Sequence, residues 1–426
     1  MANTTKIAAV AIVALLVVGG VAAFLFLGDD GEGEKNTMGR LQVYGNVDND
    51  DHIDSDDLKA FDAMTESWDS DANPYADANR DGTLDSEDKA IIQKLINKEP
   101  CTVYYINGLG DVAKADYPIK RIGIAGTMVH PVINALDAGN LAFGKTGSSS
   151  NLDPVLDAPT YDLPQIGPKA YTIDKEEVSK YNFDAIVTLY SSTYDDVETD
   201  LEGMPIDCIR INPESSDLSL NTYLLMGFLL DRTERADAIV AFYDKYNEIL
   251  AQKVSALRSQ KTSLTMYSYG MCATDYYMTK NTVAAGTINL SDFTAEENGG
   301  KNTRSLKDDN GAWAAVEKYQ ADYIIQYTGW GVRWDTSTDL SDEFTYYGKY
   351  FEKMEAYPEN YIVINKTMPD IARSAFVAGL IYDQIGLDFA YDLYEELIET
   401  FYPYIEDYDA ETAACFITYD MVKDQL

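Results

Sequence analysis

The chain has 426 residues, of which 46% are hydrophobic and 12% aromatic, enough to build the cores of at least two domains. Acidic residues number 71 against 33 basic ones, and the net charge of -38 would repel a phosphate backbone, which argues against nucleic-acid binding. Two histidines, His52 and His130, are too few for a three-histidine zinc site. The four cysteines form no CxxC motif, and their spacing is compatible with free thiols or with one or two disulfides.

The first segment, residues 1–27, predicts a signal anchor that crosses the membrane once. Residues 7–27 are apolar and, as a helix, would span about 30 Å, the thickness of the hydrocarbon core. Lys6 before this stretch and acidic residues after it place the bulk of the chain outside the cytoplasm. A cleaved signal peptide is the alternative, although the length of the apolar stretch favours an anchor. The polar residues 28–40 are expected to form a linker.

Residues 41–99 contain an internal repeat of two twelve-residue loops, each followed by apolar residues at helical spacing. Oxygen-bearing side chains recur at positions 1, 3, 5, 9 and 12 of both loops, and position 7 offers a backbone carbonyl. Because Ca²⁺ takes six to eight oxygen ligands, the repeat predicts a small all-α module with two Ca²⁺ sites. The second loop matches better, since Gly82 stands at position 6 where the first loop has Asp51. The expected metal-binding residues are Asn46, Asp48, Asp50, His52, Asp54, Asp57, Asp77, Asn79, Asp81, Thr83, Asp85 and Asp88.

This repeat resembles a dockerin module, whose EF-hand-like loops end in Asp at position 12. The resemblance implies a cohesin-like module as a partner, docked through positions 10 and 11 of the loops, which are residues 55–56 and 86–87 here. A rigid, calcium-locked stalk without such a partner is the alternative.

From residue 101 onward, short apolar strands alternate with helical stretches, which predicts an α/β fold with parallel sheets. A helical stretch without Gly or Pro, at about residues 233–260, is long enough to join two lobes. We therefore expect two Rossmann-like lobes, an N-lobe at 101–230 and a C-lobe with closing helices at 261–426, joined by a linker helix at 231–260. The strands are expected at 102–106, 118–124, 185–189, 264–267, 323–327 and 361–364.

The layout resembles the periplasmic binding proteins that capture ferric siderophores, haem or cobalamin for ABC importers. It covers about residues 101–405 and implies a non-enzymatic, extracytoplasmic binding protein with an iron chelate or a corrinoid as ligand and an ABC permease as partner. The sequence leaves open which of these ligands is bound. The resemblance rests on the phrases YPIKRIG at 117–123, YNFDAIVT at 181–188, ENGGKN at 297–302, YQADYII at 319–325 and the closing segment 372–402.

Ligands of α/β lobes bind outside the carboxyl ends of the strands, so the residues that follow each strand are the candidates. Aromatic rings suit a flat macrocycle or a catechol-like chelate, and arginines suit its negative charge. The expected ligand-binding residues are Thr127, Met128, His130, Tyr190, Ser191, Tyr269, Trp330, Arg333, Trp334 and Arg373. The alternatives are that single tyrosines are bystanders, that His130 is a loop or cap residue, and that the tryptophans belong to the core.

We expect no catalytic function. Two histidines do not support a Ser-His-Asp arrangement, and the sequence has no GxSxG and no phosphate-binding glycine loop. The calcium module leaves two other classes open, a surface glycan hydrolase with paired carboxylates and a non-catalytic adhesion or scaffold protein.

Overall fold

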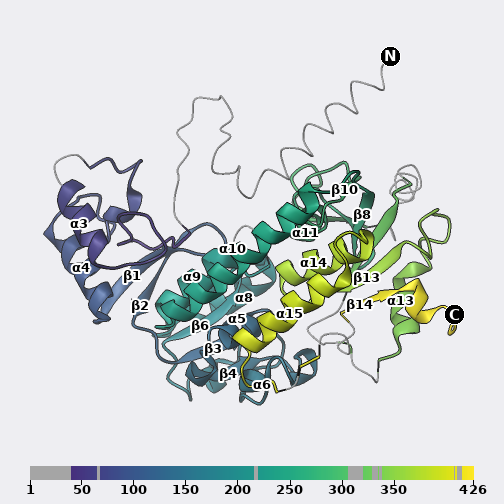
Figure 1. The fold of residues 1–426 in the computed structure, drawn as a ribbon. Helices are drawn as coiled ribbons and strands as arrows, with labels where there is room; N and C mark the ends of the chain where they lie inside the picture. The colour runs from purple at the N-terminus through teal and green to yellow at the C-terminus, as the bar shows by residue number, and fades with distance from the viewer. Residues whose placement is uncertain are drawn as a thin grey trace. The chain divides into compact units, whose positions relative to one another are not determined.

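The computed structural model describes residues 40–64, 68–214, 219–305, 320–328, 334, 338–406, 408–409 and 415–426. These residues fall into two compact units, of which the first ends at Ala241 and the second begins at Phe242. The boundary lies within helix α10, Thr233–Ser255, which matches the predicted linker helix. Figure 1 shows the elements of both units.

The first unit begins with a helical module that contains the two repeated loops. Helices α3 (Ser55–Met64) and α4 (Ser86–Asn97) follow the loops, and the short 3-10 helix η1 (Pro74–Ala76) precedes the second one. A capping box begins α4: the Asp85 side chain accepts the backbone N–H of Asp88, and the Asp88 side chain accepts the backbone N–H of Asp85. Apolar residues of both loops and both helices form the module's core: Val47, Ile53, Phe61, Ala76, Ala78, Leu84 and Ile92.

The N-lobe follows, built on a parallel sheet as predicted. The antiparallel hairpin of β1 (Cys101–Ile106) and β2 (Val112–Tyr117) precedes it. The sheet has the order β5-β4-β3-β6-β7, with all neighbours parallel. Its strands are β3 (Ile122–Ala125), β4 (Ala142–Thr146), β5 (Gln165–Gly167), β6 (Ala185–Leu189) and β7 (Asp207–Ile211). Its helices are α5 (Val129–Ala135), α6 (Ala158–Tyr161), α7 (Lys175–Val178), α8 (Asp195–Leu201) and α9 (Ser219–Leu229).

The strand order creates a topological switch point in the N-lobe. The chain adds β4 and β5 on one side of β3 and then returns to add β6 and β7 on the other. Open sheets of this type bind ligands at such a point, outside the carboxyl ends of the two central strands. Every residue of β3 and β6 is buried, as is typical of the central strands of a parallel sheet. The strand expected at 118–124 begins only at Ile122, after Lys120 and Arg121, whereas β6 has the predicted bounds.

The second unit has a mixed sheet, in which the central strands are parallel as predicted and antiparallel strands are added beside them. Strands β8 (Thr262–Tyr267), β12 (Tyr323–Thr328) and β13 (Tyr361–Asn365) are parallel, and β10 (Ile288–Asn289) joins β8 in the same direction. Strands β9 (Gly270–Cys272), β11 (Thr303–Ser305) and β14 (Phe416–Thr418) are antiparallel to their neighbours. The reason is local: the chain turns back directly after β8 at Ser268, whose φ is 50°, and so short a connection permits only an antiparallel neighbour.

Helices cover this second sheet. They are α11 (Tyr277–Ala284), α13 (Leu340–Gly348), α14 (Asp370–Ile381), α15 (Leu387–Phe401) and α16 (Tyr419–Val422), and Figure 1 shows α14 and α15 side by side. A buried cluster joins residues of β8, β12, β13 and α13, among them Leu264, Ile324, Val363 and Phe344.

Two predictions from the sequence concern the membrane anchor and the state of the cysteines. Among the described residues, no helix is both long and apolar enough to cross a bilayer, and the expected anchor at 7–27 lies outside them. All four cysteines are free thiols, with Cys272 and Cys415 buried, which favours the thiol alternative over disulfides.

Candidate functional site

The switch point of the N-lobe brings four predicted site residues together. Thr127 and Met128 follow β3, and Tyr190 and Ser191 follow β6. Because β3 pairs with β6 along its whole length, the two strands end side by side. All four residues are half-buried, so each retains surface at the carboxyl edge of the sheet.

Arg210 of β7 holds the loop after β6 in place. Its buried guanidinium donates to the three successive carbonyl oxygens of residues 189–191 at 2.8 to 3.4 Å. It also pairs with the carboxylates of Asp195 (2.8 Å) and Glu198 (3.1 Å) in α8. Sequence analysis missed this residue, and the only signal was one arginine between the two isoleucines of the segment DCIRI.

His130 lies inside the N-lobe and not at its edge. It is 1% exposed on α5, and its Nδ1 lies 2.8 Å from the hydroxyl of Thr160. Burial lowers the pKa of His130 to about 3, with a further contribution from Lys145, so the imidazole is neutral at physiological pH. The structure therefore gives His130 a buried position within α5, which differs from the predicted ligand contact and also from the alternative of a loop or cap residue.

The second unit presents a cluster of tyrosines beyond the carboxyl end of β8. The ring of Tyr269 lies 5.0 Å from that of Tyr347 and 5.5 Å from that of Tyr350. Its hydroxyl bonds to that of Tyr346 at 2.9 Å, and this bond raises the pKa of Tyr269 to about 12, so the phenol stays protonated. Tyr346 is 50% exposed, and the ammonium of Lys349 lies 5.3 Å from its ring centroid. Of these residues only Tyr269 was predicted, because α13 is remote in sequence.

Two other predicted residues of this unit are interior. Trp334 is 5% exposed and belongs to the buried core cluster. Arg373 is 3% exposed, donates to the carbonyl of Lys366 at 2.7 Å and lies over the ring of Tyr277. Both side chains thus have structural partners in place of exposed surface at the strand ends. Trp330 and Arg333 lie outside the described residues.

The second repeated loop is closed by hydrogen bonds from its backbone to side chains at positions 1 and 3. The Asp77 carboxylate at position 1 accepts backbone N–H groups from Asp81 (3.1 Å) and Gly82 (2.9 Å). Gly82 has a φ of 86°, a conformation that suits glycine at this sharp turn. The side-chain Oδ1 of Asn79 accepts the backbone N–H of Asp81 as well, at 2.8 Å, so positions 1 and 3 both bond to the backbone of position 5.

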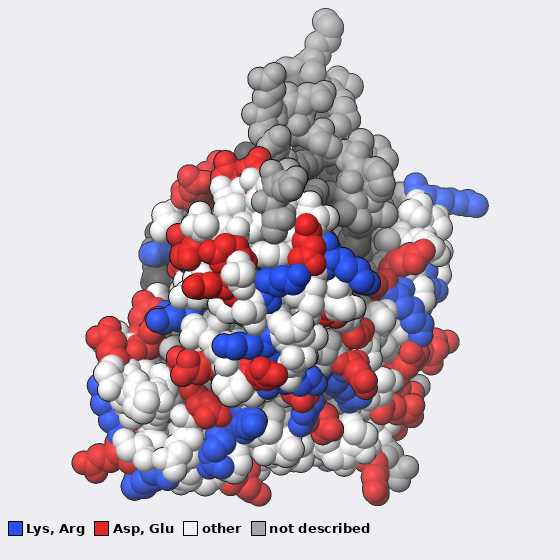
Figure 2. Space-filling view, turned by 90° about the vertical axis from the view of Figure 1, so that its left-hand side faces the viewer, with Lys and Arg blue, Asp and Glu red and all other residues white. Residues whose placement is uncertain are grey.

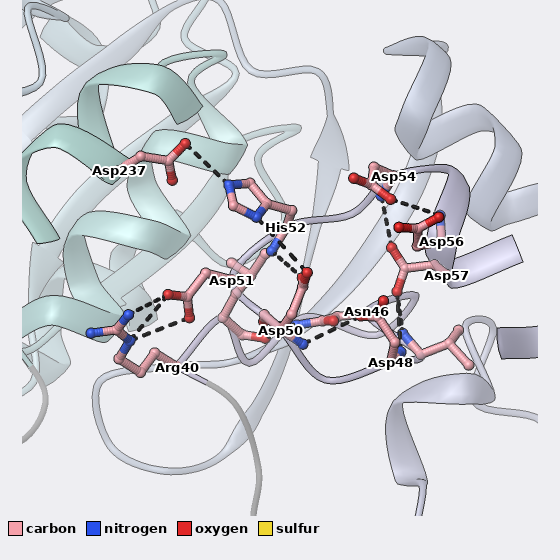
Figure 3. A network of polar contacts seen from close by, with 12 residues as sticks. Arg40, Asn46, Asp48, Asp50, Asp51, His52, Asp54, Asp56, Asp57 and Asp237 are labelled. Atoms are coloured by element: carbon pink, nitrogen blue, oxygen red, sulfur yellow. Dashed lines mark hydrogen bonds and ion pairs between the residues drawn. The ribbon is translucent and has the colours of Figure 1, made fainter. Parts of the chain in front are cut away.

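The first loop is arranged differently at position 1, as Figure 3 shows. The side-chain amide of Asn46 donates to the carbonyls of Leu41 and Asp50, both at 2.7 Å. Its Oδ1 is buried and has no hydrogen-bond partner among the described residues. At position 6, Asp51 forms an ion pair with Arg40, where the second loop has its glycine.

Each loop ends in a buried carboxylate at position 12. Asp57 accepts backbone N–H groups from positions 2 and 9 at 2.6 and 2.7 Å, and Asp88 accepts those from positions 3 and 9 at 3.1 and 2.9 Å. Burial raises the pKa of Asp57 to about 6 and also raises the pKa of Asp88. A buried carboxylate without a counter-charge is costly, and a bound cation would offset that cost.

These donors fit Ca²⁺ in their chemistry, because they supply carboxylate, amide and carbonyl oxygens. Among the described residues, no three Asp, Glu, His or Cys side chains converge closely enough to form a metal site by themselves. The fit therefore rests on the buried carboxylates and on the unpaired Oδ1 of Asn46.

The first loop also contacts helix α10 within the same unit. The Nε2 of His52, at position 7, lies 3.1 Å from the carboxylate of Asp237, and its backbone N–H donates to Asp50 at 2.6 Å (Figure 3). Lys98, at the end of α4, pairs with Asp231 before α10. The module is thus joined to the N-lobe at two separate ion pairs.

Despite the large negative charge, the surface is not uniformly acidic. Figure 2 shows Lys and Arg side chains interspersed with Asp and Glu on one face. Exposed basic residues also form ion pairs with acidic ones, such as Lys175–Asp200 and Lys180–Glu177. An anionic ligand therefore does not meet a repulsive field over the whole surface.

The fold resembles that of solved periplasmic binding proteins. A TroA-like periplasmic binding protein, FepB, from Veillonella parvula has a TM-score of 0.53 at 14% identity, over 74% of this chain and 99% of that one. A periplasmic solute-binding protein from the same species gives 0.54 at 15% identity, over 74% and 97%. The molybdate periplasmic binding protein MolA of a Haemophilus influenzae ABC transporter gives 0.54 at 13% identity, over 70% and 98%.

The chain therefore has a fold similar to that of solved periplasmic binding proteins, one of them described as TroA-like and one from an ABC transporter. At such identities the likeness concerns the fold alone. No protein-family model and no curated protein sequence matches the chain.

Proposed function

We propose that the chain is an extracytoplasmic substrate-binding protein that captures a ferric chelate, either a siderophore or haem, or a cobalamin, for an ABC permease. The observation that carries this proposal is the tyrosine cluster beyond β8, in which Tyr269, Tyr346 and Tyr350 lie beside Lys349. Rings of this kind stack on a planar ligand, and an ammonium beside them pairs with its negative charge. Within the N-lobe itself, half-buried Tyr190 and Thr127 follow the carboxyl ends of β6 and β3.

Binding of this kind requires side chains that are already held in position before the ligand arrives. Arg210 keeps the loop of Tyr190 fixed, so little conformational entropy is lost there when a ligand binds. The protonated phenol of Tyr269 acts as a hydrogen-bonding and stacking group for the chelate.

A ligand titration tests this proposal. The full chain in detergent micelles is titrated with haem, cyanocobalamin, ferric enterobactin and molybdate, with intrinsic tryptophan fluorescence as the readout. Molybdate is included because MolA binds it. Saturable quenching by one of the first three supports the proposal, and a coloured ligand that copurifies with the chain would identify it directly. If the chain binds only molybdate, its ligand is a small oxyanion and not a chelate, and the proposal is wrong. If it binds none of the four ligands, the proposal is overturned.

We further propose that residues 41–99 form a dockerin-like module with a Ca²⁺ ion in each loop. The ion would neutralise the buried carboxylates of Asp57 and Asp88 and would use the free Oδ1 of Asn46. The two ion pairs to the N-lobe favour the rigid stalk, while the exposed residues 55–56 and 86–87 leave a surface for a cohesin-like partner. A pull-down with cohesin modules, with and without calcium, separates the two roles.

Membrane anchoring through residues 7–27 completes the proposal. A binder tethered in the same bilayer as its permease meets it at a raised effective concentration.

A further inference from the structure

The β1–β2 hairpin runs alongside β7, the edge strand of the N-lobe sheet. At the start of β7, the carboxylate of Asp207 accepts the backbone N–H of Asp116 at 2.7 Å. At the end of β7, the carbonyl of Arg210 accepts the backbone N–H of Gly108 at 2.8 Å. These two bonds place the hairpin's turn, residues 107–111, at the carboxyl edge of the sheet.

The turn lies directly against the end of β7. A Cβ atom on Gly108 would lie 2.5 Å from the backbone carbonyl carbon of Ile211, so no larger residue fits without a shift. Ile211 accepts the backbone N–H of Tyr190 at 3.0 Å. One strand therefore separates the turn from Tyr190, and the turn adjoins the switch-point site within the same lobe.

The turn is held in one conformation by its own hydrogen bonds. The Oδ1 of Asn107 accepts the backbone N–H groups of Leu109 (2.9 Å) and Asp111 (3.1 Å). On the other side of the hairpin, residues 42–44 of the module bond to β1. Leu109 is nevertheless 46% exposed, so a rigid turn presents a large apolar side chain to solvent at the binding edge.

We propose that residues 107–111 form one wall of the N-lobe's ligand site, and that Leu109 packs against the organic frame of the bound chelate. This inference rests on the proposed function. Because the turn is already ordered, its apolar contact costs little conformational entropy on binding. The contact also selects by size, since a macrocycle or a large chelate reaches the turn from the switch point, whereas a small oxyanion does not.

Affinity measurements on the full-length chain test the inference. The probe is whichever of haem, cyanocobalamin and ferric enterobactin the wild-type chain binds. Leu109→Ala removes the apolar contact and is expected to weaken binding about five- to tenfold. Gly108→Ala keeps Leu109 but displaces the turn from β7, and is expected to weaken binding at least as much. Met421→Ala, which truncates a side chain that is 43% exposed in the second unit, is the matched control and retains wild-type affinity.

The outcomes separate this inference from the proposed function. If the wild-type chain binds none of the three probes, the proposed function fails and the inference fails with it. If it binds a probe and Leu109→Ala binds equally tightly at an unchanged melting temperature, the inference is overturned while the proposed function stands. If the Gly108→Ala variant does not fold, the affinity of the Leu109→Ala variant alone tests the inference.

Discussion

Arg210 is a buried side chain that orders much of the carboxyl edge of the N-lobe sheet. Its guanidinium satisfies the carbonyls of residues 189–191 and the carboxylates of Asp195 and Glu198. Since charged hydrogen bonds contribute about 1.5–3 kcal/mol, Arg210→Ala should lower the free energy of unfolding by about 2–3 kcal/mol, measured by urea titration. Arg232→Ala, which removes a half-exposed arginine bonded to Asn140 and a carbonyl, should cost less than ~1 kcal/mol. Equal losses in the two variants would contradict the anchoring role.

Asp157 should make the stability of the N-lobe depend on pH. Burial raises its pKa from 3.8 to about 7, helped by the charge of Asp153. The folded state therefore holds this proton more tightly than the unfolded state. The stability gained from protonation is complete below pH 4 and is lost as the pH rises through 7, by up to about 4 kcal/mol. Asp157→Asn should flatten the fall in melting temperature between pH 5 and pH 8, and identical slopes would exclude this role.

Tyr346 tests the tyrosine cluster without disturbing the core, because it is 50% exposed. Aromatic pairs contribute about 0.5–1.5 kcal/mol beyond their buried area, so Tyr346→Ala should weaken chelate binding about three- to tenfold. Its melting temperature should change by less than about 2 °C. Tyr404→Ala, an exposed tyrosine outside the cluster, should bind as the wild type does. A large loss of stability in place of affinity would assign Tyr346 to packing.

At the scale of elements, the two loops should differ in their response to calcium. Asp88 is fully buried and closes the loop that has glycine at position 6, whereas Asn46 offers a single neutral oxygen. Saturating Ca²⁺ at a hundred times Kd should stabilise the wild-type module by about 2.7 kcal/mol per site. Asp88→Ala should lose more of this gain than Asn46→Ala, measured as the shift in melting temperature on adding EDTA. Because Asp88 also takes part in the capping box of α4, the comparison is made with and without calcium for each variant.

An unchanged melting profile on chelation would rule out calcium as a structural ion of the module. Loss of the module's helical signal, with the second unit unaffected, would show that metal binding supplies its folding energy.

At the scale of the whole molecule, we expect residues 7–27 to stay on the mature chain as an uncleaved membrane anchor. If residues 7–27 are an anchor, the mature chain retains its N-terminal residues and stays with membranes after a high-salt wash. Mass spectrometry of the purified protein checks this expectation. A mature N-terminus near Gly28 would establish a cleaved signal peptide.

Much of this fold was predictable because its central strands are buried on both faces. Strands β3, β6, β12 and β13 appear in the sequence as apolar runs, and the periodicity of α3, α4 and α10 marks them as helices. The candidate residues were chosen by the rule that ligands bind past the carboxyl ends of such strands. Half-buried Thr127, Tyr190 and Tyr269 lie where this rule places them.

What the sequence by itself determined is thus the set of elements that local periodicity encodes, together with the oxygen spacing of the two loops. The tertiary structure decided which side chains face solvent at the strand ends, because the type of a residue does not determine where its side chain points. His130, Trp334 and Arg373 are interior. It also decided which distant segments meet. Arg210 gathers the loop after β6, α13 brings Tyr346 to Tyr269, and the hairpin turn reaches the end of β7. Such pairings depend on contacts between residues far apart in the chain, and local periodicity carries no information about them.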